Sequence, residues 1–467
     1  MFTSLPIYRV FLVATFIAAL TVRTTSSHAG EATAKPNIVF LLIDDLGFAD
    51  CGFNGGKDIQ TPNIDKLARE GSVLDSLYVQ PVCSPTRSAL MTGRYATHTG
   101  VYTIVRPHAP WGLPLQERTL ANALKDAGYA TAITGKWHLG EFQPTYLPMA
   151  RGFDHHYGHY FGMIDYNTHM RGNDLDWYRD GQQLKEEGYS THLIAHEACR
   201  VIAEKANPKP LFLYVPFNGV HAPFMVPENY LTAYPKLSGA RLKLAGMLSA
   251  VDEAIGQIVG ALEKTGQRAN TLIIFSSDNG GPKPGDNTPL RGYKGSIWEG
   301  GVRACGFVNW PGKIAPGVHI KEPMHTIDWY PTLVKLAGGS LEQKTVIDGK
   351  DVWPMLTRST PSPHDVILSV QSPTTAAVRM GDWKLLMNAG KTDNEEGAEG
   401  SAAPKKKGKA KKDDKTVPGT SFALYNLTND ISESTDLAAK EPERLATLKA
   451  KLAELLKDAA TPGQLVQ

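Results

Sequence analysis

The residues of this chain most suited to chemistry form a short motif around Cys83. The sequence Cys83-Ser-Pro-Thr-Arg87 resembles a helix start, because Pro85 suits a first turn and Ser84 or Thr86 could cap it. Backbone N–H groups at a helix start stabilise developing negative charge, and Arg87 adds a permanent cation about one turn further on. Such a cysteine could equally be an inert buried side chain or half of a disulfide, so the motif needs partners elsewhere.

Polar partners are found where apolar segments of the chain end. Continuous β-branched strands, of the kind buried on both faces of a parallel sheet, are predicted at 37–43, 130–134, 211–215 and 271–275. Helices are predicted between them at 120–127, 192–206 and 241–264, which indicates an α/β fold. Ligands of such sheets bind at the carboxyl ends of the strands, where we expect Asp44, Asp45, Lys136, His138, His221, Asp278 and Asn279 to converge.

A glycine-rich segment, 289–303, has no clear strand before it and presents Lys294 between bulky residues. A single lysine is by default a solvated surface residue. Only the neighbouring motifs suggest that Lys294 belongs to the same site.

The acidic and amide residues of the site form an oxygen-only set: Asp44, Asp45, Asp278 and Asn279. Adjacent buried carboxylates need a cation or a shared proton, although a solvated loop or a helix cap is the simpler alternative for Asp44 and Asp45. Oxygen ligands suit a hard cation, and calcium tolerates crowded carboxylates better than magnesium. The histidines His155, His156 and His159 could suggest zinc, but we expect them to lie in an aromatic-rich loop.

Composition is that of an ordinary globular protein. The chain has 467 residues, of which 42% are hydrophobic and 21% charged, so more than one folding unit is expected. The formal net charge of +2 is accounted for by the lysine-rich segment 391–415, and nothing indicates a nucleic-acid-binding surface. Four cysteines, at 51, 83, 199 and 305, are too few for a disulfide framework.

The first 29 residues are predicted to be a secretory signal peptide. Arg9 precedes an apolar run from Val10 to Leu20, and small and polar residues follow up to Gly30. A retained N-terminal anchor is the alternative. We expect no later segment to be long and apolar enough to cross a membrane.

The character of the chain changes beyond residue 345. We therefore expect a catalytic domain at 36–345 and a smaller C-terminal subdomain at 346–467, with no chemistry of its own. Strands are predicted at 375–380, 383–386 and 422–425, and an amphipathic helix at 441–457. The low-complexity segment 389–419 is predicted to be a disordered insertion, or alternatively a polyanion-binding tail, and Asn426-Leu-Thr428 is a glycosylation sequon.

Several of these motifs together resemble a known family. Cys83-x-Pro85-x-Arg87, followed by Thr92-Gly-Arg94, and the block Gly135-Lys-Trp-His-Leu-Gly140 are similar to the two signatures of the type I sulfatases. The resemblance covers residues 36 to about 458. It implies the alkaline-phosphatase-like fold, in which helices flank a mostly parallel sheet and a smaller antiparallel sheet with a helix forms the C-terminal subdomain.

The resemblance also implies a role for each matching residue. Cys83 would be oxidised to formylglycine, and its hydrate would be the nucleophile on sulfur, next to one calcium ion. The other calcium ligands would be Asp44, Asp45, Asp278 and Asn279. Arg87 would stabilise the nucleophile, and the sulfate oxygens would be bound by Lys136 and Lys294. His138 would take a proton from the second hydroxyl, and His221 with Lys294 would assist the leaving oxygen as acid.

Within the family, segments 151–166, 221–227 and 288–303 resemble the arylsulfatase B branch, the N-acetylgalactosamine-4-sulfatases. This implies a sulfated carbohydrate substrate and a formylglycine-generating enzyme as maturation partner. The few cysteines and the lysine-rich insertion fit an exported bacterial protein, periplasmic or extracellular, better than a lysosomal one. Two alternatives stay open: a phosphonate or phosphodiester hydrolase of the same superfamily, and a sulfated-glycan-binding protein with an unmodified cysteine.

Overall fold

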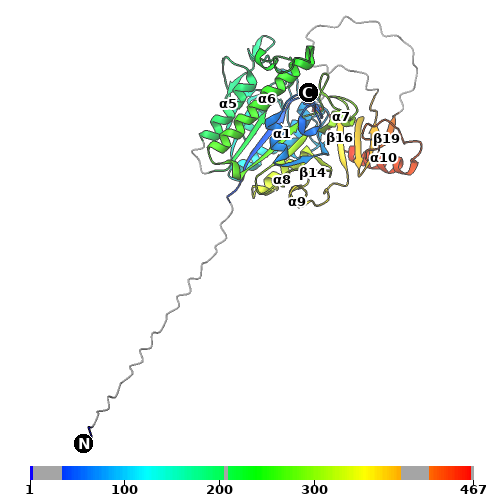
Figure 1. Cartoon of the computed structure of the whole chain (residues 1–467). Helices are drawn as coiled ribbons and strands as arrows, with labels where there is room; N and C mark the ends of the chain where they lie inside the picture. Colours follow the sequence, from blue (N-terminus) through cyan, green and yellow to red (C-terminus); the bar gives the residue numbers. More distant parts are fainter. Residues whose placement is uncertain (4–33, 205–208, 391–419, 464–467) are drawn as a thin grey trace. The chain divides into compact units, whose positions relative to one another are not determined.

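The computed structural model describes residues 1–3, 34–204, 209–390 and 420–463 (Figure 1). The chain divides into two units, Met1–Ala34 and Lys35–Gln467, and the helices and strands of the described residues all lie in the second unit. Residues 4–29 of the predicted signal peptide and residues 391–419 of the predicted insertion lie outside the described residues.

A ten-stranded sheet with the order β14-β2-β13-β11-β1-β10-β4-β5-β8-β9 organises the second unit. Its centre is five parallel strands: β11 (Thr271–Ser277), β1 (Asn37–Ile43), β10 (Leu211–Pro216), β4 (Ala130–Lys136) and β5 (His155–His159). The outer strands are β2 (Ser72–Leu74), β8 (Tyr178–Arg179), β9 (Gln182–Gln183), β13 (Gly306–Asn309) and β14 (Val318–Ile320). The four strands predicted from apolar runs are thus adjacent and parallel, which confirms the predicted α/β fold.

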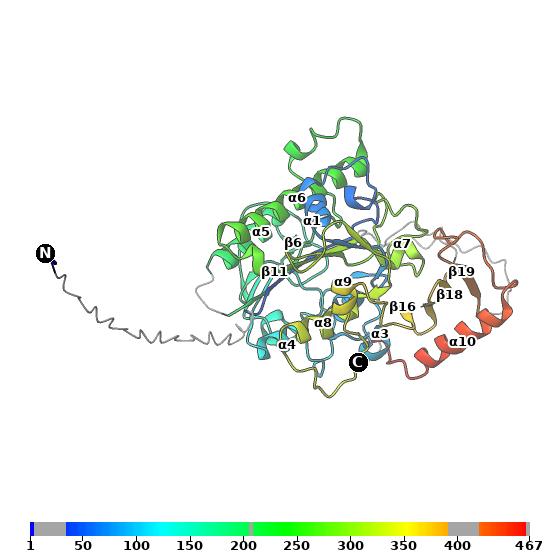
Figure 2. The ribbon, with the colours of Figure 1, turned by 60° about the horizontal axis from the view of Figure 1, so that its bottom comes forward.

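Helices cover both faces of this sheet, because alternate side chains of each central strand point to opposite sides. In β1, Val39, Leu41 and Ile43 join one hydrophobic core, while Ile38, Phe40 and Leu42 join the other. The first core is closed by α1 (Pro62–Arg69), α5 (Ser190–Ala203) and α6 (Gly239–Lys264). The second is closed by α2 (Cys83–Thr92), α4 (Leu120–Asp126), α8 (Trp329–Leu336) and α9 (Trp353–Arg358), and Figure 2 shows α5 and α6 opposite α4 and α8.

Helix α6 corrects one expectation. Its 26 residues are long and apolar enough to cross a membrane by length and composition, with a mean hydropathy of 1.2 in the most apolar window. However, 61% of that window is buried inside the protein, and Leu244, Met247 and Leu248 belong to the core against the sheet. A core helix meets the same criteria, so length and composition alone do not indicate a membrane span here.

A separate four-stranded antiparallel sheet lies near the C-terminus, as predicted (Figure 1). It contains β16 (Ile367–Ser372), β17 (Thr375–Met380), β18 (Trp383–Met387) and β19 (Phe422–Asn426), and α10 (Pro442–Leu456) packs against it. Strand β16 was not predicted. The boundary at 345 stays a prediction, and α9 beyond it packs in the core of the large sheet.

The remaining elements are short. A three-stranded sheet contains β12 (Arg303–Ala304), β3 (Leu77–Tyr78) and β15 (Met324–His325), and a hairpin contains β6 (Met170–Arg171) and β7 (Asp174–Leu175). The short helices are α3 (Ala96–Thr99) and α7 (Glu299–Val302).

Candidate active site

The carboxyl ends of β1, β10 and β11 are joined by backbone hydrogen bonds that hold their polar residues together. The Asp44 N–H donates to the Gly219 carbonyl at 3.0 Å, and the Asp278 N–H donates to the Ile43 carbonyl at 3.1 Å. The Asp45 N–H donates to Asp278 Oδ1 at 3.2 Å. The strand ends therefore converge as the sequence predicts.

Cys83 is the first residue of α2 and lies inside this convergence. Its Sγ is 3.4 Å from Asp44 Oδ1 and 3.5 Å from Lys294 Nζ, and the side chain is fully buried. Burial raises the pKa of the Cys83 thiol well above its ordinary value, and the carboxylates of Asp278 and Asp44 raise it further. The sequence therefore places Cys83 correctly at a helix start within the polar cluster.

The predicted caps of that helix are wrong. The N-cap residue is Val82, and no side chain caps the helix. Ser84 Oγ instead donates to the His138 carbonyl at 2.8 Å and accepts from the Val105 N–H at 3.0 Å. Thr86 Oγ1 accepts from the Gln80 N–H at 2.9 Å. Ser84 thus binds two distant segments, whereas Thr86 binds Gln80, six residues earlier in the segment that leads into α2; both hydroxyls are buried and satisfy backbone groups there.

Four side chains lie close enough together to hold a metal ion: Asp44, Asp45, Cys83 and His221 have ligand atoms within 4.8 Å of one another, and all four are buried. Asn279 extends this set, since its Nδ2 donates to Asp45 Oδ1 at 2.7 Å. Asn279 Oδ1 is buried and has no hydrogen-bond partner among the described residues. A buried acceptor beside carboxylates is the arrangement that a hard cation satisfies, so these residues fit the implied calcium ion.

Three cations surround the carboxylates. Arg87 Nη2 lies 2.9 Å from Asp278 Oδ2, Lys136 Nζ lies 2.5 Å from Asp44 Oδ2, and Lys294 Nζ lies 2.9 Å from Asp45 Oδ1. Burial alone would raise the pKa of Asp44, but Lys136, His221 and Arg87 together hold it below its ordinary value. Burial and the neighbouring Asp44 raise the pKa of Asp278. The cluster therefore combines anionic cation ligands with positive groups suited to an anionic substrate.

His221 has a defined orientation in the cluster. Its Nδ1 lies 2.5 Å from the Ala222 carbonyl, and a carbonyl oxygen can only accept, so Nδ1 carries a proton. Its Nε2 faces Asp45 Oδ2 at 3.6 Å. The sequence predicted His221 as an acid. In the structure, His221 is also one of the four side chains that lie close enough together to hold a metal ion.

His138 is held differently from the other predicted residues. Its Nε2 lies 3.1 Å from the Val105 carbonyl, which makes Nε2 the protonated nitrogen and Nδ1 the one that can accept a proton. The ring packs edge-on against Phe161 at 5.4 Å, and a Cβ on Gly162 would lie 2.4 Å from it. Ser84 ties the His138 carbonyl to α2, but His138 is not among the four clustered ligands.

Two of the predicted site residues have backbone conformations that residues other than glycine rarely adopt. Asp45 has φ of 63° and His138 has φ of 59°, both in the left-handed region. Such conformations are disfavoured for residues with a Cβ and concentrate at functional sites.

Asn287 is a site residue that sequence reasoning missed. Its Oδ1 accepts from the N–H groups of Phe48 and Gly281, and its Nδ2 donates to the carbonyls of Gly281 and Gly292. One buried amide thus joins the loop after β1, the loop after β11 and the segment that carries Lys294. An asparagine among glycines and prolines carries no periodic signal that could have predicted this role.

The three histidines that could suggest zinc do not belong to the cluster of possible metal ligands given above for the described residues. His155, His156 and His159 lie on β5, a strand rather than the expected loop, because this segment pairs with β4. The expected aromatic surroundings are present: His156 stacks on Tyr160 and His159 on Trp177.

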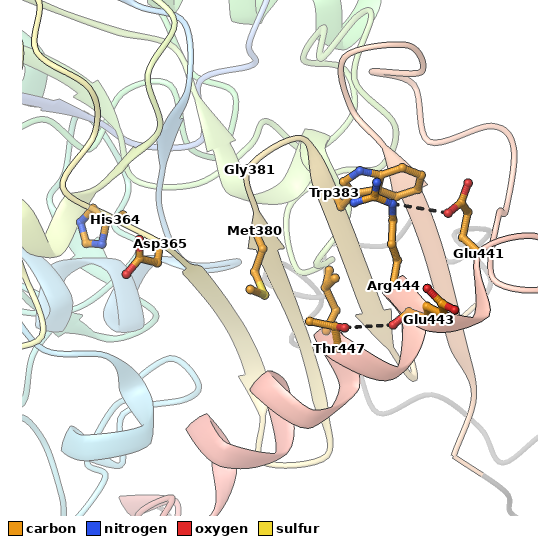
Figure 3. A pocket seen from close by; sticks show the side chains of 10 residues that line it. His364, Asp365, Met380, Gly381, Trp383, Glu441, Glu443, Arg444 and Thr447 are labelled. Atoms are coloured by element: carbon orange, nitrogen blue, oxygen red, sulfur yellow. Dashed lines mark hydrogen bonds and ion pairs between the residues drawn. The ribbon is translucent and has the colours of Figure 1, made fainter.

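A surface hollow of about 790 Å³ in the C-terminal subdomain is separate from the site (Figure 3). Trp383 and Arg444 line it, with the guanidinium 4.5 Å from the ring centroid and 3.4 Å from the Glu441 carboxylate. None of the predicted catalytic residues lines this hollow.

Comparisons with known proteins match most of this chain. Mouse (Mus musculus) arylsulfatase J is 38% identical and is covered over 78% of its length by 92% of this chain. Mouse N-acetylgalactosamine-6-sulfatase is 33% identical, over 76% of this chain and 72% of that protein. The crystal structure of Ps i-CgsB in complex with k-i-k-neocarrahexaose has a TM-score of 0.81 at 32% identity, covering 92% of this chain and 94% of that one. The family model described as Sulfatase matches residues 36–340, and the chain belongs to the sulfatase family, whose members are sulfuric ester hydrolases.

Proposed function

We propose that this protein is an exported sulfatase that removes sulfate from sulfated carbohydrates, using a formylglycine made from Cys83 and one calcium ion. The observation that carries the proposal is the position of Cys83 Sγ, 3.4 Å from Asp44 and 3.5 Å from Lys294. The reacting atom thus lies between groups that can hold a cation and a group that can bind an anion.

The calcium ion would be held by Asp44, Asp45, Asp278 and Asn279 together with the modified residue 83. The buried, unpartnered Oδ1 of Asn279 supports this ligand set. When bound, the ion supplies positive charge for sulfate oxygens, and the formylglycine supplies a hydrated aldehyde as nucleophile.

The chain's own cations would bind and orient the sulfate. Lys136 and Lys294 would bind its oxygens, because their ammonium groups lie beside Asp44 and Asp45, at the cluster that contains residue 83. Arg87 cannot lose its proton and is fully buried, so it supplies a fixed positive charge beneath residue 83. Groups preorganised in a water-poor site stabilise developing charge more strongly than they would in water.

The two histidines would move protons in opposite directions. His221 keeps one proton on Nδ1, against the Ala222 carbonyl; as an imidazolium it would carry a second proton on Nε2 and deliver it to the leaving oxygen. His138 has Nδ1 as its basic nitrogen and would accept a proton there during the release of sulfate from residue 83.

The similarity to one protein crystallised with an oligosaccharide and to another named as a carbohydrate sulfatase supports a sulfated carbohydrate as substrate. Ps i-CgsB was crystallised with k-i-k-neocarrahexaose, and the mouse relative of 33% identity is named for N-acetylgalactosamine. The N-acetylgalactosamine-4-sulfatase branch stays a prediction. Export to the periplasm or the medium, and maturation by a formylglycine-generating enzyme, complete the proposal.

Relative rates on two chromogenic substrates test the reaction class. Protein co-produced with a formylglycine-generating enzyme is assayed on 4-nitrophenyl sulfate and on an aryl phosphodiester, with and without a calcium chelator. The proposal expects faster hydrolysis of the sulfate ester, which is lost in Cys83→Ala. Faster hydrolysis of the phosphodiester would instead favour the rival hydrolase. Binding of a sulfated glycan by fully converted protein without release of sulfate would favour the binding-protein alternative.

A further inference from the structure

The segment that carries Lys294 is a loop, so its position depends on contacts at its two ends. Residues 289–298 form neither helix nor strand, and Gly292 and Gly295 have φ of 89° and 83°. The Lys294 side chain is nevertheless only 6% exposed, with Nζ 2.9 Å from Asp45 Oδ1. Something outside the loop must hold it in place.

The C-terminal end of the loop is held by a buried charge network, formed by Glu299, Lys384 and Glu433. Lys384 on β18 lies 2.8 Å from Glu299 Oε1 and 2.9 Å from Glu433 Oε1. Glu433 Oε2 accepts from the Glu299 backbone N–H at 2.7 Å, at the start of α7. The three side chains are 2% exposed or less, and Glu299 also pairs with Arg303 and accepts a hydrogen bond from the Tyr78 hydroxyl.

The N-terminal end of the loop rests on the same part of the C-terminal subdomain. Arg291 Nη1 donates to the Glu433 carbonyl at 2.8 Å, and Ser432 Oγ donates to the Pro289 carbonyl at 2.9 Å. The Arg291 guanidinium also lies 3.7 Å from the Trp298 ring centroid. Residues 432–433 thus bind both ends of the loop.

The backbone of Glu433 supports a specific need for its carboxylate. Its φ is 50°, in the left-handed region, where glycine or asparagine would cost less. Burying a carboxylate and holding its backbone in the left-handed region both cost free energy, which the contacts of Glu433 must offset. The Glu433 carboxylate joins Lys384 on β18 to the backbone N–H of Glu299, so it ties the C-terminal end of the loop to the C-terminal sheet.

We propose that Glu433 and Lys384 are positioning residues for Lys294, and that the C-terminal subdomain thereby sets the geometry of the sulfate-binding loop. The inference rests on the proposed function for the role of Lys294, but the placement of the loop can be measured without any substrate. It gives the C-terminal sheet, expected to have no chemistry of its own, an indirect part in the reaction.

Protonation of Glu433 supplies an additional readout. Burial raises the pKa of Glu433 to about 7, with Glu299 adding to the increase and Lys384 opposing it. The charged groups around it are Lys384 on β18, Glu299 on α7 and Arg291 on the loop, with Arg303 and Arg379 beyond Glu299. Lowering the pH from 8 to 6 should therefore neutralise Glu433 and weaken its pairing with Lys384.

Hydrogen–deuterium exchange of the loop amides tests the placement directly. Glu433→Gln should raise exchange in peptides spanning 289–299 by roughly tenfold or more, while exchange in the central strands stays unchanged. Glu433→Gly, which relieves the backbone strain but removes the carboxylate, should do the same. The matched control is Glu197→Gln, which removes a buried carboxylate paired with Arg179 and Arg200, remote from the loop.

The pH dependence of exchange is a second test. After correction for intrinsic exchange rates, exchange of the wild-type loop should increase as the pH is lowered from 8 to 6, whereas exchange of the loop in Glu433→Gln should not change. Unchanged loop exchange in both Glu433 variants would overturn the proposal.

A double-mutant cycle then separates this inference from the proposed function. If Glu433 acts through Lys294, Glu433→Gln should lower kcat/KM in the wild-type background and have little further effect in Lys294→Ala. Equal losses in both backgrounds would mean that Glu433 acts by another route, and would contradict the inference. A loosened loop with unchanged kcat/KM in Lys294→Ala would leave the placement intact and refute the role of Lys294 in the proposed function.

Discussion

Asn279 donates a hydrogen bond from Nδ2 to Asp45 Oδ1 at 2.7 Å, and its own Oδ1 is buried without a hydrogen-bond partner among the described residues. An amide oriented in this way presents its oxygen beside the carboxylates at the ends of β1 and β11. A buried acceptor without a hydrogen-bond donor costs free energy. A cation bound to the Asn279 oxygen would remove this cost.

We predict that Asn279→Ala weakens calcium binding by roughly tenfold or more, because it removes one oxygen ligand and frees the Asp45 carboxylate to reorient. Calorimetric titration of the calcium-free protein measures the change. Asn309→Ala is a suitable control, since Asn309 is also a buried asparagine but bonds the Leu67 carbonyl away from the site. Equal calcium affinities for wild type and Asn279→Ala would refute the ligand assignment.

Calcium should stabilise the folded protein, because the site gathers carboxylates that repel one another. At calcium a thousandfold above its dissociation constant, linkage predicts about 4 kcal/mol of added stability. Thermal unfolding with a chelator, and then with calcium or zinc restored, measures the effect. Recovery with zinc alone would contradict a hard-cation site.

Lys136→Met should destabilise the calcium-free protein more than the calcium-loaded one. Lys136 Nζ lies 2.5 Å from Asp44 Oδ2 and both side chains are fully buried, so its loss leaves this carboxylate with the more distant Arg87, whose Nη2 lies 3.6 Å away. Removal of one partner of such a pair costs roughly 3–5 kcal/mol, part of which bound calcium should offset. Lys335→Met, which breaks an exposed pair with Asp351, controls for charge removal alone. The account is contradicted if Lys136→Met shifts the Tm equally with and without calcium.

Glu299 should contribute to stability in a pH-dependent way. Burial alone would raise its pKa, but Lys384, Arg303 and Arg379 lower the pKa of Glu299 to about 2. The ordinary unfolded value is about 4.3. Because the folded pKa is depressed, the stabilisation is fully present above about pH 4.3 and is lost as the pH falls through about 2. Denaturant unfolding of wild type and Glu299→Gln should therefore differ at pH 7 and converge towards pH 2; a constant difference would show that the charge is not responsible.

Local patterns in the sequence predicted most of the fold and most of the candidate site. Apolar runs ending in polar residues located β1, β4, β10 and β11, since a parallel sheet forces their carboxyl ends to one edge. Strand β16 was missed although Ser372-Pro373 marks the turn that leads from it into β17.

Interactions between distant segments could not be predicted in this way. Asn287 joins three loops, and Glu433 binds the loop of Lys294 from 139 residues further along the chain; neither residue stands in a periodic or motif context. The Ser84 cap proposed for α2 failed for the same reason, because Ser84 binds the His138 carbonyl, which tertiary packing brings to it, whereas Thr86 binds the nearby Gln80. The preference of serine and threonine for capping a helix is overridden where the hydroxyl and another polar group are buried together and bind each other.

The measurement that tests the central claim most directly compares sulfate release with the extent of Cys83 oxidation. Preparations that contain different fractions of formylglycine, quantified by mass spectrometry of the peptide carrying residue 83, are assayed with 4-nitrophenyl sulfate and with sulfated oligosaccharides. The account predicts a rate proportional to the converted fraction, extrapolating to zero for unmodified cysteine and absent in Cys83→Ala. Sulfate release that does not depend on conversion, or fully converted protein that releases no sulfate from any of these esters, would contradict it.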